Sequence, residues 1–277
     1  MIGAIIGDIV GSTYEFHNTQ NYDFELFPQG SSFTDDTVCT IAIADAILRG
    51  IPYRDSLIEW CRKYPHPKGA YGASFSRWIY DPQPYDSFGN GAAMRVSAIG
   101  WAFKTYTETV LQAIRSAECS HSHDEGKRGA GAIASCIYIL RTKHWKEAKD
   151  DVKAKLIQLY GEGYIDRLPK VGEWNETCQG CVPLAIHLFL QSKSFEDAIR
   201  LAISYGGDSD TLGAIVGSLA GAFYEIPQEI TSKALSYLPD DMMNVIGEFL
   251  EKYNHLFLND YLCDYMASYI DSHPKFS

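Results

Sequence analysis

Residues 206–224 read GGDSDTLGAIVGSLAGAFY, in which a short acidic turn runs directly into apolar and small residues. The apolar positions recur with helical spacing, and the small residues between them let a neighbouring helix approach closely. Residues 129–140, GAGAIASCIYIL, have the same character. Both stretches predict helices that pack closely against others in a buried core.

Helical periodicity extends along most of the chain. The predicted helices cover residues 37–49, 92–104, 108–119, 129–141, 182–191, 195–203, 212–224, 241–253 and 259–270. Alternating strand patterns are nearly absent, and residues 24–27 are the one short candidate. The sequence therefore predicts an all-α protein, a compact single domain over residues 1–277 with no linker.

Composition and charge exclude several classes of protein. The 277 residues carry 24 Lys and Arg against 35 Asp and Glu, a net charge of −11, and 46% of the residues are hydrophobic. This balance is typical of a soluble globular protein and excludes a disordered chain. The acidic charge argues against nucleic acid as a partner, unless it is itself the modified substrate, because binding phosphates needs a basic face. No run approaches the ~20 apolar residues of a membrane span, so no membrane partner is expected.

The seven cysteines are scattered through apolar helical patterns. An odd, scattered set favours reduced, buried thiols and a cytoplasmic location. Cys178 and Cys181 have CxxC spacing, but no second pair lies at zinc-finger spacing and no βαβ pattern precedes them. We therefore interpret these two residues as core thiols.

Two long loops are candidates for holding a ligand. Proline and glycine concentrate at residues 64–91, and glycine recurs at residues 161–180. Long ordered loops in a helical enzyme are where ligands tend to be held.

Two of the predicted helices begin with paired acids. Thr34-Asp35-Asp36-Thr37 precedes one, and Asp208-Ser209-Asp210-Thr211 precedes another. Each pair alone is explained by helix capping, in which Thr34 caps and the acids oppose the helix dipole. Because both helices are otherwise apolar, both starts are expected near the core, where four converging carboxylates need a cation between them. Carboxylates and hydroxyls are the ligands that Mg²⁺ and Mn²⁺ prefer, so capping and a metal site both stay open.

Three further motifs carry possible chemistry. Glu15 follows a glycine-punctuated apolar helix and is either surface decoration or a ligand or base of the same cavity. The Gly89-Asn90-Gly91 turn leads into a predicted helix, where free backbone amides would favour a phosphate. His121, within Ser120-His-Ser-His-Asp, begins another helix and favours an anion-binding or capping role over a metal-ligand role. Arg95, which belongs to the same motif as the Gly89–Gly91 turn, either neutralises phosphate or pairs with a neighbouring acid.

In their order along the chain, these motifs resemble the ADP-ribosylglycohydrolase family. The matching segments are GAIIGDIVGSTYEF, FTDDTVCTIAIADAIL, DSFGNGAAMRVSAIGWAF, SHSHDEGKRGAGAIA and TCQGCVPLAIHLFL, followed by the stretch that ends in GGDSDTLGAIVGSLAGAFY. They span residues 3–224, and the pairing of TDDT with GGDSDT is the most specific part. The resemblance implies an all-α fold with a binuclear Mg²⁺ or Mn²⁺ centre.

The resemblance also implies a role for each matching residue. The metal ligands would be Thr34, Asp35, Asp36, Asp208, Asp210 and Thr211. Glu15 matches the family's acidic residue near the metals, and Glu15 or Asp36 would be the catalytic carboxylate. Contacts with ADP-ribose would come from Gly89, Asn90, Gly91, Ser120 and His121. His123-Asp124 stands where close relatives have His-Pro, and residues beyond 224 match no motif.

The function that the resemblance implies is metal-dependent hydrolysis of the bond between ADP-ribose and an acceptor on a protein or small molecule. One alternative is a metal-dependent phosphohydrolase that uses the same acids with His121 and His123. Another is a member of the family that binds ADP-ribose without catalysis, although retention of every carboxylate in both motifs argues against it. The acceptor, the metal and the oligomeric state stay open.

Overall fold

The structure, a computed structural model, describes residues 1–83 and 85–253. Its helices are α1 (Ile2–Gly11), α2 (Asp35–Arg49), α3 (Tyr53–Lys63), α4 (Ala73–Trp78), α5 (Gly91–Met94), α6 (Ser97–Ala102), α7 (Tyr106–Glu118), α8 (Asp124–Thr142), α9 (Trp145–Tyr160), the 3₁₀ helix η1 (Glu162–Arg167), α10 (Cys178–Gln191), α11 (Phe195–Tyr205), α12 (Ser209–Ala220), α13 (Gln228–Leu235) and α14 (Asp240–Tyr253). Over the described residues only isolated β-bridges occur, so the all-α prediction is confirmed.

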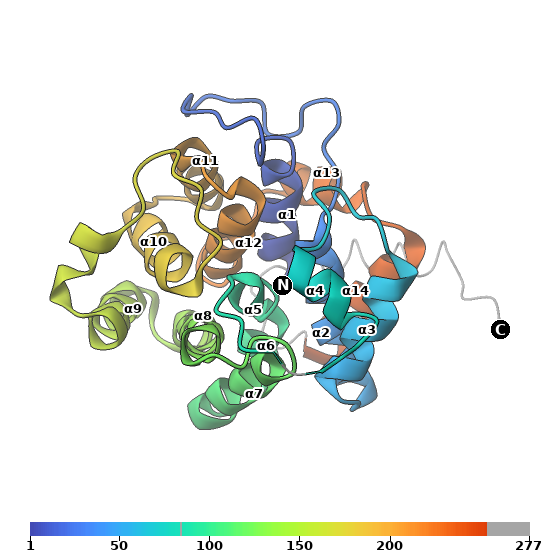
Figure 1. The fold of residues 1–277 in the computed structure, drawn as a ribbon. Helices are drawn as coiled ribbons and strands as arrows, with labels where there is room; N and C mark the ends of the chain where they lie inside the picture. Colours follow the sequence, from blue (N-terminus) through green and yellow to red (C-terminus); the bar gives the residue numbers. More distant parts are fainter. Residues whose placement is uncertain (84, 254–277) are drawn as a thin grey trace.

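Helices α1 and α12 form the centre of the molecule (Figure 1). Every residue of both helices is buried, and the two pack on each other more extensively than any other pair. Glycines make this contact possible: a Cβ on Gly213 would lie 2.5 Å from the Gly7 oxygen, and one on Gly217 would overlap the Gly3 oxygen. Gly3 faces Gly217 and Gly7 faces Gly213, so the two helices run antiparallel.

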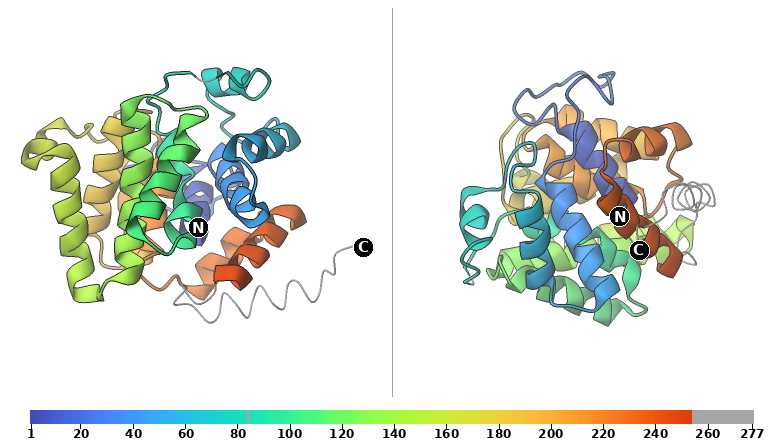
Figure 2. Two further views of the ribbon diagram at one scale, coloured as in Figure 1. Left: turned by 90° about the horizontal axis from the view of Figure 1, so that it is seen from below. Right: turned by 90° about the vertical axis from the view of Figure 1, so that its right-hand side faces the viewer.

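The other helices cover this central pair on two sides. Helices α8, α9, α10 and α11 lie on one side, whereas α2, α3 and α14 lie on the other (Figure 1). The left view of Figure 2 shows the same division, with α8 and α9 far from α2 and α3. The buried hydrophobic residues of the described chain form one cluster, to which α1, α12 and both flanks contribute.

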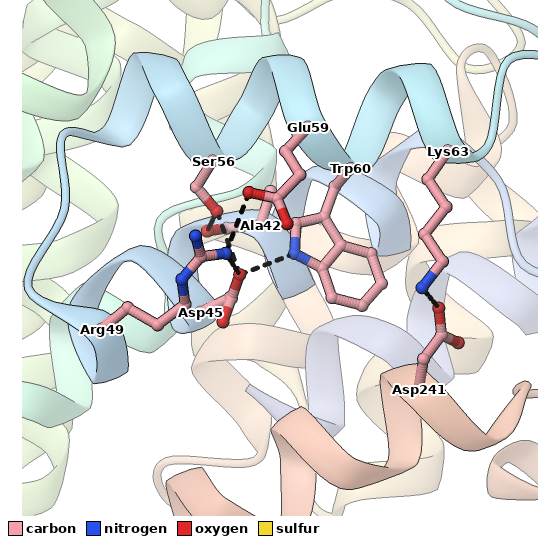
Figure 3. Close-up of polar contacts among 8 residues, drawn as sticks. All are labelled: Ala42, Asp45, Arg49, Ser56, Glu59, Trp60, Lys63 and Asp241. Atoms are coloured by element: carbon pink, nitrogen blue, oxygen red, sulfur yellow. Dashed lines mark hydrogen bonds and ion pairs between the residues drawn. The ribbon is translucent and has the colours of Figure 1, made fainter.

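Polar contacts join the helices of the α2 flank (Figure 3). The Asp45 carboxylate on α2 accepts hydrogen bonds from Trp60 Nε1 of α3 and from Arg49 Nη1, both at 2.9 Å. Lys63 at the end of α3 pairs with Asp241 of α14 at 2.5 Å. These contacts fix the direction of α2, whose other end carries the first acid pair.

The predicted helices appear with shifted ends, and one prediction is wrong. Residues 92–104 are two short helices, α5 and α6, because the chain turns at Arg95, whose buried guanidinium bonds the Ser116 carbonyl and Ser120. The sequence patterns missed α3, α4, α9 and α13, which carry many polar residues. The helix predicted at residues 259–270 lies outside the described residues.

The strand candidate at residues 24–27 is also wrong. The segment is irregular, and no described strand lies beside it. Phe24 is buried and packs edge-on against Tyr14, with ring centroids 5.0 Å apart. The Phe24 carbonyl accepts a hydrogen bond from Arg200 Nη1 at 2.8 Å, so a side chain satisfies the group that a strand neighbour would have satisfied.

The thiols of the described residues are free, and all except Cys119 are buried. Cys178 donates to the Gly89 carbonyl at 3.1 Å and Cys181 is buried beside it in α10, as expected for core thiols. Within residues 1–83 and 85–253, no helix combines the length and apolar character that crossing a membrane requires.

The glycine contact between α1 and α12 gives a testable prediction. Gly217→Ala should lower the free energy of unfolding by about 2–3 kcal/mol, because the new methyl group overlaps backbone that cannot move aside. Gly131→Ala on α8 is the matched control, since its Cβ would lie 3.7 Å from Val110 and 3.9 Å from Ile114. We expect the control to be neutral or to stabilise by up to about 1 kcal/mol. Urea denaturation measures both, and equal stability of the two variants would contradict the close contact.

Candidate active site

The two acidic helix starts lie on one cavity. Because α12 runs antiparallel to α1, its first turn lies beside Gly11 at the end of α1. Thr211 Oγ1 donates to Asp36 Oδ2 at 3.1 Å, which joins the start of α12 directly to the start of α2. The cavity has a volume of about 480 Å³, and its lining includes Glu15, Asp35, Asp36, Asp208, Asp210 and Thr211. The prediction that the two starts converge is confirmed by this geometry.

Asp8 on α1 holds the start of α2. Its carboxylate accepts hydrogen bonds from the Thr34 amide at 3.0 Å, the Thr34 hydroxyl at 2.7 Å and the Thr37 amide at 3.0 Å, and another from the Thr37 hydroxyl. Asp8 is fully buried. It therefore acts as a cap supplied by a different helix, and the sequence analysis did not identify it. The signal was available, since Asp8 is the one charged residue in the apolar run of residues 1–11.

Thr34 lies beneath the cavity and outside its lining residues. Its hydroxyl donates to Asp8 and accepts a hydrogen bond from the Asp36 amide at 3.1 Å. Thr34 is thus the N-cap of α2, as the capping interpretation predicts. Its role as a metal ligand stays a prediction.

Two glycines and Asn18 place Glu15 beside the start of α12. Gly206 and Gly207 have φ of 80° and 84°, a conformation that disfavours side chains, and this turns the chain sharply into Asp208. The Asn18 side chain accepts from the Gly207 amide at 2.6 Å and donates to the Gly207 carbonyl and to the Glu15 carbonyl, both at 3.0 Å. The loop that carries Glu15 is therefore fastened to the turn before α12.

Three carboxylate oxygens of this cluster are buried without a hydrogen-bond partner. They are Glu15 Oε2, Asp36 Oδ1 and Asp210 Oδ1, and they come from three different segments of the described chain. A buried acceptor without a partner is costly, and a buried charge more so. All three residues line the same cavity, so a ligand of positive charge there would satisfy them together.

Burial and mutual repulsion raise the pKa of the acids in this cluster. Burial, together with the charge of Asp210, raises the pKa of Asp8 to about 7. Burial raises the pKa of Glu15 to about 8, with Asp210 and Asp8 adding to the effect. The pKa values of Asp36 and Asp208 are raised well above the usual range by burial and then by Asp210. The site without a cation therefore favours protonated acids.

The donor set fits hard divalent cations. Carboxylate and hydroxyl oxygens dominate it, and three of the carboxylate oxygens lack partners. Among the described residues, no group of three or more His, Cys, Asp or Glu side chains is already arranged to hold a metal. Asp36 and Asp208 instead accept hydrogen bonds from Thr211 and Asn90. A binuclear centre therefore stays a prediction that the chemistry of the donors supports.

The Gly89–Gly91 turn also lines the cavity, but its amides are not all free. The Asn90 amide donates to the Glu176 carbonyl at 2.7 Å, and the Gly89 amide donates to Ser87 Oγ at 3.1 Å. The helix that follows, α5, has only four residues and a correspondingly small dipole. The prediction that free backbone amides of this turn hold a phosphate is therefore wrong for Gly89 and Asn90, whose amides are already bonded. A Cβ on Gly91 would lie 3.0 Å from His121 Nε2, so the His121 side chain and the Gly89–Gly91 turn face each other.

His121 lines the cavity, whereas Ser120 lies behind it and is fully buried. Ser120 Oγ lies 2.8 Å from His121 Nδ1 and 2.8 Å from Arg95 Nη2. Arg95 also lines the cavity, and among the described residues it has no acidic partner in an ion pair. The pairing of Arg95 with a neighbouring acid, one of the two alternatives left by the sequence, is not observed.

Both predicted ligand loops contribute to the cavity, and they add residues that the motifs did not identify. Trp174 stacks on Phe16, which follows Glu15 and lies outside both loops, with ring centroids 5.6 Å apart; 66% of the Phe16 surface and 43% of the Trp174 surface are exposed. Glu176, Tyr71 and Phe75 also line the cavity. The abundance of glycine and proline located the loops, but composition could not identify which of their side chains face inward.

The acid cluster predicts an unusual pH dependence of stability without metal. The pKa values of Asp8 and Glu15, about 7 and about 8, lie above those of the unfolded chain, near 4. The folded state therefore binds protons more tightly, and the stability these groups contribute is lost as pH rises through 7 and 8. We expect the Tm with EDTA to fall by several degrees between pH 6 and pH 9.

Asp210→Asn is the comparison for this experiment. It removes a charge that adds to burial in raising both pKa values, so it should raise the Tm without metal at pH 8 and weaken the pH dependence. Saturating Mn²⁺ should also make the Tm of the wild type depend less on pH. A wild-type Tm that is constant or rises over this range in EDTA would contradict the converging acids.

The chain is similar to known proteins over most of its length. The chain is 26% identical to ADP-ribosylhydrolase ARH3 of Mus musculus, over 82% of this chain and 83% of that protein. It is 22% identical to the ADP-ribosyl-dinitrogen reductase glycohydrolase of Rhodospirillum rubrum, over 86% and 88% of the two chains. A solved structure described as an ADP-ribosylglycohydrolase-related protein complex has the same fold, with a TM-score of 0.68 at 22% identity, over 91% of this chain and 97% of that one.

The family itself is settled by a match over most of the sequence. The family model of the ADP-ribosylglycohydrolases matches residues 1–259, which include every acid of the cavity and the turn that faces them. The chain therefore belongs to the ADP-ribosylglycohydrolase family.

Proposed function

We propose that this protein is a metal-dependent hydrolase that cleaves the glycosidic bond between ADP-ribose and an acceptor on a protein or a small molecule. The observation that carries the proposal is the set of three unpartnered carboxylate oxygens, from Glu15, Asp36 and Asp210, on one cavity of a chain in this family. The named relatives are ADP-ribosyl hydrolases, which supports the same substrate class. The free thiols of the described residues favour a reducing compartment, and we propose the cytoplasm.

Two Mg²⁺ or Mn²⁺ ions would be held by Thr34, Asp35, Asp36, Asp208, Asp210 and Thr211. Divalent cations bound there would supply positive charge that neutralises the acids and polarises oxygen groups of the substrate and of water. Asn90 supports this arrangement because its side-chain amide donates to Asp208 Oδ2 at 2.6 Å and so holds that carboxylate in place.

The side chains of this protein would carry out the remaining steps of the hydrolysis. Glu15 or Asp36 would accept the proton of the attacking water as the general base, since each has an unpartnered oxygen facing the cavity. The transition state of glycosidic cleavage carries positive charge on the ribose, and the Glu15 carboxylate, which is outside the proposed ligand set, would stabilise it. His121 and the residues Gly89, Asn90 and Gly91 would orient the diphosphate, and water would replace the acceptor at the ribose carbon.

A panel of ADP-ribosylated substrates tests this function directly. ADP-ribose linked to arginine, serine, a nucleobase, an acetyl group and poly(ADP-ribose) is incubated with Mg²⁺, Mn²⁺ or EDTA, and released ADP-ribose and phosphate are measured. We expect free ADP-ribose from at least one substrate, only with metal, and no phosphate. Phosphate release from nucleotides would favour a phosphohydrolase, and tight binding of ADP-ribose without turnover would favour a catalytically silent binder.

Removing single charges from the acid cluster tests whether its residues bind the metal. Asp36→Asn and Asp210→Asn should each lower kcat/KM at least about 100-fold, because each removes a negative ligand while preserving shape. Helix content by circular dichroism should stay that of the wild type.

Asp151→Asn is the matched control for these two variants. Its side chain lies on α9, is 44% exposed and makes one long ion pair of 3.6 Å with Lys143, so the substitution should leave activity unchanged. Wild-type turnover by Asp36→Asn or Asp210→Asn, or by the wild type in EDTA, would refute the role of the cluster in metal binding.

A further inference from the structure

The Arg95 guanidinium is a fully buried cation in the wall of the cavity. Its Nη2 donates to the Ser116 carbonyl at 2.9 Å and to Ser120 Oγ at 2.8 Å. It also lies over the ring of Phe75, with 5.8 Å from the guanidinium carbon to the ring centroid. A guanidinium has only donors, so Ser120 Oγ must be the acceptor in its bond with Arg95.

The hydroxyl hydrogen of Ser120 then needs an acceptor of its own. Ser120 is fully buried, so water is not available to it. His121 Nδ1 lies 2.8 Å from Ser120 Oγ. The neighbouring Cys119 thiol is the other group within reach of the hydroxyl, but sulfur is a weak acceptor. The hydrogen therefore points to His121 Nδ1.

An accepting Nδ1 determines which nitrogen of His121 carries the hydrogen. A neutral imidazole with an unprotonated Nδ1 carries its hydrogen on Nε2. Nε2 is the nitrogen that faces the turn, since a Cβ on Gly91 would lie 3.0 Å from it and one on Gly89 would lie 3.5 Å away. Burial and the charge of Arg95 hold the pKa of His121 well below its usual range, so the ring stays neutral.

We propose that Arg95 and Ser120 are positioning residues that fix His121 in the tautomer with its hydrogen on Nε2. His121 thereby presents one neutral hydrogen-bond donor to an anionic oxygen of the ligand at the Gly89–Gly91 turn. The ligand part of this inference rests on the proposed function, whereas the tautomer depends only on the buried hydrogen bonds. Because the amides of Gly89 and Asn90 are already bonded, this donor replaces part of the cradle that the turn does not supply.

The first measurement reads the tautomer in the full-length protein. Histidine labelled at its ring nitrogens is incorporated, and long-range proton–nitrogen correlation shows which nitrogen of each ring bears hydrogen. The His121 signal is assigned from its loss in His121→Gln. We expect a protonated Nε2 and an unprotonated Nδ1 between pH 6 and pH 8. A hydrogen on Nδ1 in the wild type would overturn the proposal, whether or not any variant folds.

The second measurement compares variants by binding of ADP-ribose, with Mg²⁺ present, in a calorimeter. Ser120→Ala should lose the tautomer preference and weaken binding about tenfold, the loss expected for one hydrogen bond to a charged group. Ser120→Thr keeps the hydroxyl and should restore both properties. Cys119→Ala is the matched control, because it removes only the weak alternative acceptor and should change neither.

Two outcomes separate this inference from the proposed function. A Ser120→Ala protein with the wild-type tautomer and wild-type affinity would overturn the roles of Ser120 and Arg95. A wild type with the hydrogen on Nε2 that binds no ADP-ribose would support the hydrogen-bond chain and contradict the proposed function instead.

Discussion

The glycine contact between α1 and α12 is the constraint on which the rest of the structure depends. It brings two fully buried helices so close that the end of α1 lies beside the start of α12. From α1, Asp8 then holds the start of α2 through bonds to Thr34 and Thr37. Acid-bearing helix starts that are about 170 residues apart in the sequence thereby line one cavity. A wider spacing of α1 and α12 would separate them.

Much of this arrangement was predictable from the sequence, and the exceptions have physical causes. Small residues at helical spacing predicted close helix packing, and paired acids at apolar helix starts predicted their convergence. The resemblance to the ADP-ribosylglycohydrolase family added the expected roles of the site residues. The break between α5 and α6 was not predictable, because a buried Arg95 that bonds distant groups stops a helix which the local pattern would continue. Asp8 was missed because its partners lie 26 and 29 residues away. For Ser120, no local pattern indicates that its hydroxyl contacts Arg95 rather than the cavity.

The cavity combines opposite electrostatic environments in one space. Carboxylates that repel one another, and whose pKa values are raised, lie on one side, where cations would relieve the repulsion. Arg95, which is fully buried, and His121, whose ring is neutral, line the same cavity beside the Gly89–Gly91 turn. A ligand that carries hydroxyl groups at one end and a diphosphate at the other would complement both environments. This polarity favours a ribosyl diphosphate over a small neutral substrate.

The central claim is that the starts of α2 and α12 hold divalent cations between them. Anomalous diffraction from a crystal grown with Mn²⁺ tests it most directly, because the signal locates the ions independently of any assay. We expect anomalous peaks bounded by Asp36 and Asp210, within reach of Glu15. Crystals without a peak there, with the two acidic starts on separate surfaces, would contradict it.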